Sequence, residues 1–538
     1  MPTSGSAMTG FTPFPPDRAT AYRDAGYWAG RPLDEILRSA AARWPDHPAV
    51  IDDRTTLTYA ELDRRADSAA AGLVGLGIGT GDAVLVQLPN SCQFAVALFG
   101  LLRAGALPVM CLPGHRDAEL AHFLDVSEAV GVIVGTDAGF DFRAMAERLL
   151  ERDNKLRHII VDGDAGPHIS WPQLCAGDGR PPQLCPDTCG PAVLLVSGGT
   201  TGAPKLIPRT HDDYVYNATA SAQLCELTDA DVYLVSLPAG HNFPLACPGL
   251  LGAMTVGATV VFGRDPSPEA AFATIARHGV TATALVPALA RLWAQACEWE
   301  EQLPTTLRLL QVGGAKLAAD DARQIRSVLT PGLQQVFGMA EGLLCYTRIG
   351  DPAEIVDQTQ GRPLAEHDEL RIVDDAGVAV PDGEPGELLV RGPYTINGYF
   401  RAEAENQRSF TPDGFYRSGD KVRRFANGYV EVTGRVKDVI LRAGETISAL
   451  DLESHLLTHP AVSTAAAVGL PDPYLGEKIC AAIVFRGRPV SLSELNDHLD
   501  ARGVAVHSRP DMIAPMPALP TTAVGKVDKR AIVAQLCP

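Results

Sequence analysis

The sequence predicts an α/β protein with largely parallel sheets, followed by a β-rich stretch and a separate C-terminal domain. Three observations support this prediction. The chain has 538 residues, which is more than a single hydrophobic core usually holds. Short apolar runs alternate with segments of helical spacing through its first half and beyond. From about residue 368 the pattern changes to short strands separated by Asp-Gly and Pro-Gly turns.

The first part of the chain alternates helices and strands. Apolar residues at helical spacing predict helices over 33–44, 58–77 and 94–105, the last of which ends at Gly105. Short apolar runs rich in β-branched residues predict strands at 83–89, 107–112, 130–135, 158–163, 192–197, 258–263, 282–287 and 307–314. Because helical stretches separate several of these strands, we expect them to pair mainly in parallel.

The C-terminal part has a different pattern of predicted strands and helices. Gly434 and Arg435 interrupt two strand-like runs within 429–440. Beyond them, helices are predicted at 450–460 and 492–503, with strands around 465–471 and 479–485 between the two. We therefore expect a domain boundary near Gly434. The part that follows has about one hundred residues, enough for a core of its own.

Charge and composition exclude several classes of function. The formal net charge is −18, and such a field opposes binding to nucleic acid or to an anionic membrane. The apolar runs are too short to span a bilayer, and the N-terminus lacks the basic and apolar regions of a signal peptide. The 11 cysteines are odd in number and scattered, which favours reduced thiols. The sequence therefore predicts a cytoplasmic enzyme that meets any anionic ligand in a local basic pocket.

A candidate phosphate loop, SGGTTGAPK, follows the predicted strand at 192–197. Converging backbone N–H groups can hold a phosphate there, and Lys205 adds positive charge. The small residues of the loop are Ser197, Gly198, Gly199, Thr200 and Thr201. The spacing does not fit GxxxxGK[ST], so a P-loop nucleoside triphosphatase is not expected. Taken alone, the loop is equally consistent with a surface turn.

Further motifs follow this loop along the chain. They are VFGMAEG at 336–342, YRSGD at 416–420, GRVKD at 434–438, AGE at 443–445 and PTTAVGK at 520–526. In this order they resemble the motifs of the adenylate-forming superfamily, which contains acyl-CoA synthetases, luciferases and the adenylation domains of nonribosomal peptide synthesis. The resemblance implies a large N-terminal domain of two mainly parallel sheets with helices plus a small β-subdomain, and a small mobile α+β C-terminal domain.

The resemblance also implies domain limits. The adenylation core would span residues 1–433, with its β-subdomain from about residue 368. Residues 434–437 would form a hinge with Lys437 as the hinge residue, and 438–538 would form a C-terminal lid. After rotation of the lid, the segment 443–445 would line a tunnel for a pantetheine thiol.

ATP and Mg²⁺ are the cofactors that the resemblance implies. Lys526 matches the catalytic lysine, which bridges the acid's carboxylate and the α-phosphate as negative charge builds. Glu341 matches the magnesium-associated glutamate, and His241 completes the implied catalytic set. Gly314 and Gly338 would form walls around adenine, where a larger side chain would clash. The implied ATP-binding residues are Ser197, Gly198, Gly199, Thr200, Thr201, Lys205, Gly314, Ala315, Val336, Gly338, Asp420, Arg435 and Lys526, with Asp420 and Arg435 at the ribose.

The segment 239–252 resembles the acid pocket of stand-alone aryl-acid adenylating enzymes. Amino-acid-activating relatives carry an aspartate where this chain has Asn242, and a neutral amide suits a phenolic 2-hydroxyl better than an ammonium. Cys247 stands where dihydroxybenzoate enzymes have a serine that contacts the 3-hydroxyl. Because a thiol is a poor hydrogen-bonding group, Cys247 favours salicylate, which lacks this hydroxyl. Phe243 favours salicylate as well. The implied substrate-binding residues are His241, Asn242, Phe243, Cys247, Gly314, Gly338, Met339, Ala340 and Leu344.

These matches imply an enzyme that forms salicyl-AMP and pyrophosphate from salicylate and ATP. It would then transfer the salicyl group to the phosphopantetheine thiol of an aryl carrier domain on a separate peptide synthetase, in siderophore (mycobactin) biosynthesis. A 2,3-dihydroxybenzoate-AMP ligase and an aryl-CoA ligase are alternatives that share most of the motifs. An inactive adenylate-binding scaffold is a further alternative, but it would have no physical need for the catalytic lysine.

Four residues near these motifs receive no functional role from the sequence. Arg209 and His211 lie just beyond the phosphate loop, and His211 fits a packed residue at a helix start equally well. Cys345 stands where relatives often carry a polar residue. Lys529, close to Lys526, has the character of an ordinary solvated lysine.

Overall fold

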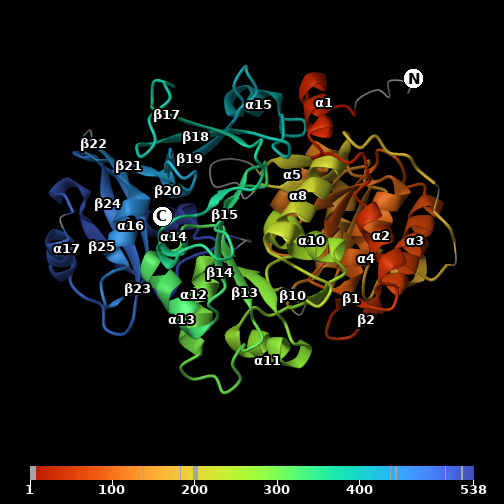
Figure 1. Ribbon diagram of the computed structural model, residues 1–538, viewed down its shortest axis with the longest axis horizontal. Helices are drawn as coiled ribbons and strands as arrows, with labels where there is room; N and C mark the ends of the chain where they lie inside the picture. Colours follow the sequence, from red (N-terminus) through yellow and green to blue (C-terminus); the bar gives the residue numbers. More distant parts are fainter. Residues whose placement is uncertain are drawn as a thin grey trace. The chain divides into compact units, whose positions relative to one another are not determined.

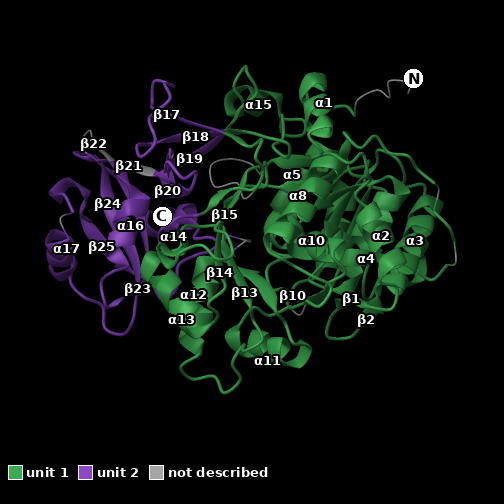
Figure 2. Ribbon diagram, in the orientation of Figure 1, with its two compact units in different colours: residues 1–357, 361–369, 390–416 green, residues 358–360, 370–389, 417–538 purple. Residues whose placement is uncertain are grey.

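The computed structural model describes residues 8–136, 139–177, 179–181, 183–197, 204–436, 438–442, 445–502, 504–522 and 525–537. The described chain forms two compact units, drawn in different colours in Figure 2. Unit 1 contains residues 1–357, 361–369 and 390–416, and unit 2 contains residues 358–360, 370–389 and 417–538. The predicted core of 1–433, hinge at 434–437 and lid of 438–538 stay predictions.

One sheet of unit 1 is built around parallel strands (Figure 1). Its strand order is β16 (Arg362–Pro363), β15 (Leu344–Tyr346), β14 (Leu333–Gly338), β13 (Leu309–Gly313), β12 (Ala282–Leu285), β10 (Val232–Val235), β11 (Thr259–Phe262), β1 (Pro48–Ile51) and β2 (Thr56–Thr58). Strands β14 to β1 in this order pair in parallel, and β15, β16 and β2 are antiparallel additions at the two edges. The parallel strands β12 and β13 are buried throughout, which explains their uninterrupted apolar character.

The second sheet of unit 1 is also mainly parallel. Its order is β7 (Ile169–Ser170), β6 (His158–Val161), β5 (Gly131–Val134), β3 (Ala83–Gln87), β4 (Leu107–Met110), β8 (Pro191–Val196) and β9 (Leu206–Thr210). Only the pair of β8 and β9 is antiparallel among these described strands. Each range that the sequence predicted as a strand in unit 1 overlaps a strand of one of the two sheets, and these strands pair mainly in parallel. The prediction of two mainly parallel sheets is therefore confirmed.

The helices of unit 1 begin and end where local chemistry favours it. Thr58 caps α3 in a reciprocal pair with Glu61, and α4 ends at Gly105, whose φ of 78° is left-handed and suits glycine. The helices are α1 (Pro16–Asp24), α2 (Glu35–Arg43), α3 (Tyr59–Gly75), α4 (Cys92–Ala104), α5 (Asp117–Ser127), α6 (Phe142–Arg152), α7 (Trp171–Leu174), α8 (His211–Leu224), α9 (Asn242–Ala246), α10 (Gly249–Thr255), α11 (Pro268–His278), α12 (Pro287–Ala296), α13 (Ala319–Val328), α14 (Ala353–Gln358) and α15 (Glu403–Ser409).

Unit 2 combines two sheets with short helices, and the second sheet with its helices confirms the α+β fold predicted for the C-terminal part. One sheet has the order β17 (Glu369–Val373), β18 (Pro385–Arg391), β19 (Tyr416–Arg424) and β20 (Val430–Arg435). The other has the order β22 (Glu445–Ser448), β21 (Val439–Arg442), β24 (Gly476–Phe485) and β23 (Val462–Asp472), with β25 (Met512–Pro515) beside β24. Its helices are α16 (Ala449–Leu456), α17 (Leu492–Ala501) and α18 (Lys529–Leu536), with a 3₁₀ turn at Val506–Ser508. Leu452, Ile479 and Leu495 lie in the core of this second sheet and its helices.

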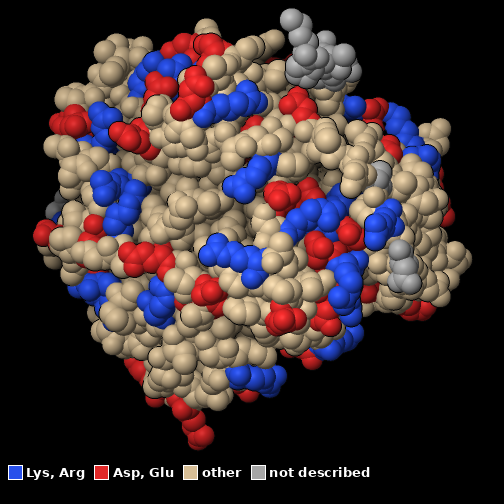
Figure 3. Space-filling model, turned by 45° about the vertical axis from the view of Figure 1, so that its right-hand side comes forward, with Lys and Arg blue, Asp and Glu red and all other residues tan. Residues whose placement is uncertain are grey.

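The surface carries mixed charge. On the face drawn in Figure 3, Lys and Arg side chains are interspersed with Asp and Glu side chains, so the basic groups there form no single continuous area. No described helix combines the length and the apolar composition that a membrane-crossing segment needs.

Candidate active site

The two ends of the predicted phosphate loop are joined by the antiparallel pair β8 and β9. The Ser197 N–H donates to the Lys205 carbonyl oxygen at 2.9 Å, and the Lys205 N–H donates to Ser197 Oγ at 2.8 Å. The residues between them that were predicted to bind phosphate, Gly198, Gly199, Thr200 and Thr201, lie outside the described residues. The hairpin thus fixes where the loop begins and where it ends.

The Lys205 side chain lies among acidic and aromatic groups of unit 1. Its Nζ is 2.8 Å from Glu405 Oε1 and 5.3 Å from the centre of the Tyr399 ring. Hydrogen bonds from Arg408 and then from Lys205 lower the pKa of Glu405 to about 2. The carboxylate is therefore charged at neutral pH. A phosphate that binds Lys205 would replace this carboxylate as its counter-ion.

Glu341 lies in the turn after β14, and its side chain is buried. The Tyr399 hydroxyl donates to Glu341 Oε1 at 2.8 Å and lies 3.0 Å from the Tyr416 hydroxyl. Burial, and then the charge of Glu341, raise the pKa of Tyr399, so the phenol stays protonated. Tyr399 thus contacts both Lys205 and Glu341, and the structure brings these two predicted residues into one cluster.

The glycines predicted to form the adenine walls lie at the ends of neighbouring strands. Gly313 pairs with Val336 across β13 and β14, and Gly338 pairs with Leu344 across β14 and β15. A Cβ on Gly338 would lie 2.5 Å from Leu344 Cδ2, so a larger residue clashes there. Gly314 is constrained differently, because its φ of 87° is a left-handed conformation that other residues rarely adopt. Ala315 follows it and is exposed.

The predicted acid pocket is centred on the short helix α9. His241 precedes the helix, and its Nδ1 accepts the Phe243 N–H at 3.3 Å. Asn242 is buried, with its Oδ1 accepting the Tyr214 hydroxyl at 2.9 Å and its Nδ2 lying 3.4 Å from Cys247 Sγ. Burial raises the pKa of the Cys247 thiol to about 12, so the group is neutral.

Phe243 connects this pocket to the glycine wall. A Cβ built on Gly313 would lie 3.2 Å from two carbons of the Phe243 ring, so the ring packs against the end of β13. Met339 also lies at this edge, because its N–H donates to the Leu343 carbonyl oxygen at 3.2 Å. The structure therefore brings the acid-pocket residues of α9 next to the strand ends that carry the predicted nucleotide wall.

Arg209, to which the sequence gave no role, is a fully buried support of this region. Its Nε is 2.9 Å from Asp213 Oδ1, and one terminal nitrogen donates to the Ala340 carbonyl oxygen at 3.2 Å. Ala340 directly precedes Glu341 in the chain. Arg209 therefore ties the end of β9 to the turn that carries the predicted magnesium ligand.

His211 and Cys345 are packing residues. The Leu33 N–H donates to His211 Nδ1 at 2.9 Å, and burial lowers the pKa of His211 to about 4, so the ring is neutral. His211 is the first residue of α8, in agreement with a packed helix-start residue. Cys345 is buried in β15, and burial raises the pKa of its thiol well above the usual value.

The predicted ribose residues meet within unit 2. Asp420 and Arg435 are opposite each other in β19 and β20, and Arg435 Nε is 2.8 Å from Asp420 Oδ1. Asp420 is buried, whereas the Arg435 side chain is half exposed. Lys437 and Gly444 lie outside the described residues.

Lys526 lies in a tight turn of unit 2. The Thr522 N–H donates to the Lys526 carbonyl oxygen at 2.7 Å, and the Lys526 N–H donates to Thr522 Oγ1 at 3.3 Å. An isolated bridge pairs Thr521 with Val527. Bonds that involve main-chain atoms therefore hold the predicted catalytic lysine and the residue after it against Thr521 and Thr522.

The interpretation of Lys529 as a solvated lysine is wrong. Its Nζ is 2.8 Å from each carboxylate oxygen of Asp438 and 2.7 Å from Glu453 Oε1. Burial by itself lowers the pKa of Lys529, but the charges of Glu453 and Asp438 raise it above the usual value. The sequence could not reveal this cluster because its three members are far apart along the chain. Lys529 is an internal cation that anchors α18 beside the Lys526 turn.

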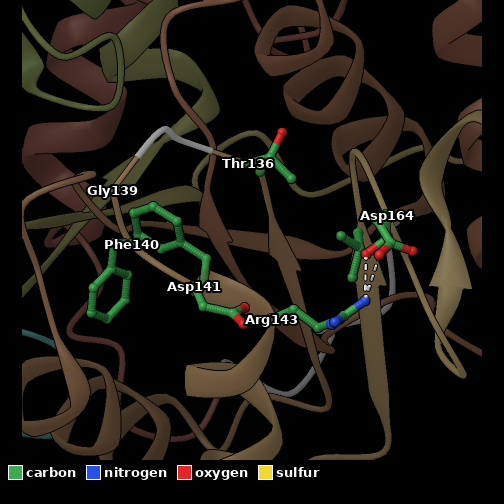
Figure 4. A pocket seen from close by; sticks show the side chains of 9 residues that line it. Thr136, Gly139, Phe140, Asp141, Arg143 and Asp164 are labelled. Carbon is green, nitrogen blue, oxygen red and sulfur yellow. Dashed lines mark hydrogen bonds and ion pairs between the residues drawn. The ribbon is translucent and has the colours of Figure 1, made fainter.

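A hollow of about 330 Å³ lies elsewhere in unit 1, at the carboxyl ends of β5 and β6 (Figure 4). It is lined by Gly135, Thr136, Gly139, Phe140, Asp141, Phe142, Arg143, Val161 and Asp164. Arg143 pairs with Asp164 at 3.2 Å. None of these described lining residues belongs to the predicted site.

Known proteins resemble the chain over nearly its whole length. Residues 37–400 match the family described as AMP-binding enzyme, and residues 451–526 match the AMP-binding enzyme C-terminal domain. A salicyl-AMP ligase / salicyl-S-ArCP synthetase of Mycobacterium tuberculosis is 68% identical, over 99% of this chain and 96% of the relative. A 2,3-dihydroxybenzoate-AMP ligase of Bacillus subtilis is 46% identical, over 98% of this chain and 97% of the relative.

Solved structures have the same fold. The apo structure of MbtA from Mycobacterium smegmatis is 68% identical with a TM-score of 0.79, covering 99% of this chain and 100% of that one. The anthranilate CoA ligase AuaEII, in complex with anthranoyl-AMP, has a TM-score of 0.84 at 24% identity, covering 96% of this chain and 99% of that one. The second likeness concerns the fold alone.

Proposed function

The chain belongs to the AMP-binding enzyme family, and from this membership we propose that it is a salicyl-AMP ligase, which joins salicylate to the AMP part of ATP and releases pyrophosphate. The observation that carries the proposal is the near-full-length similarity to a curated salicyl-AMP ligase. The chemistry of Asn242 and Cys247, which the resemblance assigns to the acid pocket, agrees with the same substrate.

Salicylate suits the pocket chemically. Asn242 is a buried neutral amide, which can bond a phenolic 2-hydroxyl but cannot neutralise the ammonium of an amino acid. Cys247 is a buried neutral thiol and a weak hydrogen-bonding group. A 3-hydroxyl placed against it would lose its bonds to water without an equivalent replacement, at a cost of roughly 1–3 kcal/mol. The pocket therefore favours salicylate over 2,3-dihydroxybenzoate.

The adenylation step brings two anions together. A carboxylate oxygen of salicylate attacks the α-phosphorus of ATP, and the bond between that phosphorus and the pyrophosphate oxygen breaks. We assign Lys205 and its loop to the departing phosphates. Lys526 would stabilise the negative charge that builds at the α-phosphate. We assign Asp420 and Arg435 to binding of the ribose. The strand ends at Gly314 and Gly338 would bind adenine.

We assign Glu341 to Mg²⁺. Its carboxylate is a hard oxygen donor, and Tyr399 holds one of its oxygens in place at 2.8 Å. Mg²⁺ prefers such an oxygen together with phosphate oxygens and water, so the residue fits the ion. When bound, Mg²⁺ would neutralise phosphate charge.

A second half-reaction follows from the same assignment. We propose that the phosphopantetheine thiol of an aryl carrier domain attacks the acyl carbon of salicyl-AMP, forming a thioester while AMP leaves. The proposed arrangement is a core of 1–433, a hinge at 434–437 with Lys437, and a lid of 438–538. The pathway we propose is siderophore (mycobactin) assembly.

Every cysteine lies in the described residues as a free thiol, which agrees with a proposed cytoplasmic location.

ATP–pyrophosphate exchange with a panel of acids tests the proposed activity. The panel contains salicylate, 2,3-dihydroxybenzoate, benzoate and several amino acids. We expect salicylate to give the highest kcat/KM, at least about tenfold above 2,3-dihydroxybenzoate, because one unsatisfied buried hydroxyl costs about that much. A preference for any amino acid would contradict the assignment of Asn242.

A further inference from the structure

The stretch RTHDDY at 209–214 contains side chains that the proposed reaction does not use. Arg209 and Thr210 end β9, and α8 begins at His211. Thr210 and Asp213 cap the helix reciprocally, and Tyr214 follows within its first turn, fully buried. This segment therefore places a tyrosine hydroxyl deep inside unit 1, where it needs a hydrogen-bond acceptor.

That acceptor is Asn242. The Tyr214 hydroxyl donates to Asn242 Oδ1 at 2.9 Å. Burial raises the pKa of Tyr214 well above its usual value, so the proton stays on the phenol. The orientation of an Asn amide follows from its partners, and a donor at 2.9 Å assigns the oxygen to this side. The Nδ2 end consequently points toward Cys247, whose Sγ lies 3.4 Å away.

The surroundings keep both partners in place. The Arg209 guanidinium lies 4.5 Å from the centre of the Tyr214 ring and is itself paired with Asp213. Asn217, one turn further along α8, donates through Nδ2 to the Ala246 carbonyl oxygen at 2.6 Å. Helix α8 thus holds α9 at both ends, through Tyr214 at Asn242 and through Asn217 at Ala246. The amide of Asn242 is fixed before an acid arrives.

We propose that Tyr214 is a positioning residue for acid selection, which orients the Asn242 amide so that its N–H donor, rather than its oxygen, meets the 2-substituent of the acid. This inference rests on the proposed function. The phenol oxygen of salicylate would accept from Nδ2, while the phenol proton bonds to the acid's own carboxylate. A 2-amino group presents protons instead of an accepting oxygen, and benzoate presents nothing, so both should be poorer substrates.

The first test compares acids in ATP–pyrophosphate exchange for the wild type and for Tyr214→Phe, which removes only the hydroxyl. We expect the ratio of kcat/KM for salicylate to that for benzoate to fall about tenfold, mainly through KM for salicylate. The values for benzoate and the KM for ATP should change less than about twofold. Tyr59→Phe is the matched control, because Tyr59 is also fully buried and donates to one acceptor, the Ala258 carbonyl oxygen. That control should leave the ratio unchanged.

A double-mutant cycle separates positioning from a packing role. If Tyr214 acts through Asn242, adding Tyr214→Phe to Asn242→Ala should lower the salicylate-to-benzoate ratio no further. An equal loss for all acids in Tyr214→Phe, or a further fall in the double variant, would overturn the inference. If Tyr214→Phe does not fold, the wild-type protein still tests the inference. Equal kcat/KM values for 2-aminobenzoate and salicylate would contradict the proposed orientation of the Asn242 amide.

The outcomes also distinguish this inference from the proposed function. A wild type without preference for salicylate over benzoate overturns the proposed function, and this inference with it. A wild type that prefers salicylate, together with a Tyr214→Phe protein that keeps the same preference, overturns the positioning role of Tyr214 alone.

Discussion

The acid pocket and the Lys526 turn are held by different kinds of contact. In unit 1, Asn242 is fixed by Tyr214, and α9 is held again by Asn217, so buried side chains bond to one another. In unit 2, Lys526 lies in a turn closed by main-chain atoms and Thr522. A group that discriminates between acids needs a fixed orientation, whereas a cation acts through its charge. We therefore expect pocket substitutions to alter selectivity and substitutions at the turn to alter rate.

The largest effect is expected for Lys526→Ala. Loss of the cation that we assign to the α-phosphate should lower salicylate-dependent ATP–pyrophosphate exchange by about 10²–10³-fold or more, because preorganised charge is a major part of such catalysis. A melting curve of the variant checks that it is folded. Activity near the wild-type level in a folded Lys526→Ala protein would remove Lys526 from the mechanism.

Lys529→Met tests whether ion pairs rather than main-chain bonds anchor the segment after the turn. The change leaves the carboxylates of Asp438 and Glu453 without their cation, so we expect the free energy of unfolding to fall by about 2 kcal/mol. Lys529→Arg keeps the charge and should lose less. Chemical denaturation measures both variants. Equal stability of Lys529→Met and the wild type would show that the cluster contributes nothing.

Asp368 supports Leu344, a predicted acid-pocket residue, through the hydroxyl of Tyr394. Tyr394 donates to Asp368 Oδ2 at 2.5 Å, and the Tyr394 hydroxyl accepts the Leu344 N–H at 3.2 Å. Burial raises the pKa of Asp368 from 3.8 to about 7. Between these pH values Asp368 keeps its proton in the folded state and loses it in the unfolded state. The protonated carboxyl therefore stabilises the fold fully below pH 4, and this stabilisation is lost as pH rises to about 7.

Asp368→Asn keeps the shape of the side chain and removes the titration. Relative to the wild type, the variant should gain roughly 1–2 kcal/mol of unfolding free energy between pH 6 and pH 8. Denaturation curves at the two pH values measure this difference. An identical pH dependence in both proteins would contradict the shifted pKa.

The smallest effect is expected for Cys247→Ser, which changes one buried atom of the pocket. A serine hydroxyl can bond a 3-hydroxyl, so the preference for salicylate over 2,3-dihydroxybenzoate should fall by about tenfold. The comparison of kcat/KM for the two acids measures it. An unchanged preference would place the selectivity elsewhere, and equal losses for both acids would point to a packing defect.

The sequence revealed most of the fold because its signals are local. Strands β3, β5 and β13 are apolar runs buried on both faces, and Gly105 ends α4 by its left-handed conformation. Strand β9 had no such signal, since LIPRT contains a proline and an arginine. It is nevertheless buried, because Asp213 on α8 neutralises Arg209.

Motifs in the sequence predicted the candidate site residues, but they gave no indication of the partners that these residues have in the structure. Tyr399 joins Lys205 and Glu341, and Tyr214 orients Asn242, although each pair comes from separate elements. Such contacts depend on how helices and strands pack, so no spacing along the chain indicates them. For the same reason, the two carboxylates around Lys529 could not be expected from the residues next to it.

A crystal structure with a non-hydrolysable salicyl-adenylate mimic tests the central claim most directly. The proposed function predicts the salicyl ring at α9, with its 2-oxygen within hydrogen-bonding distance of Asn242 Nδ2 and its 3-position facing Cys247. The phosphate-replacing end should lie toward the loop between Ser197 and Lys205. A ring bound away from Asn242 and Cys247, or a phosphate-replacing end far from that loop, would contradict the account.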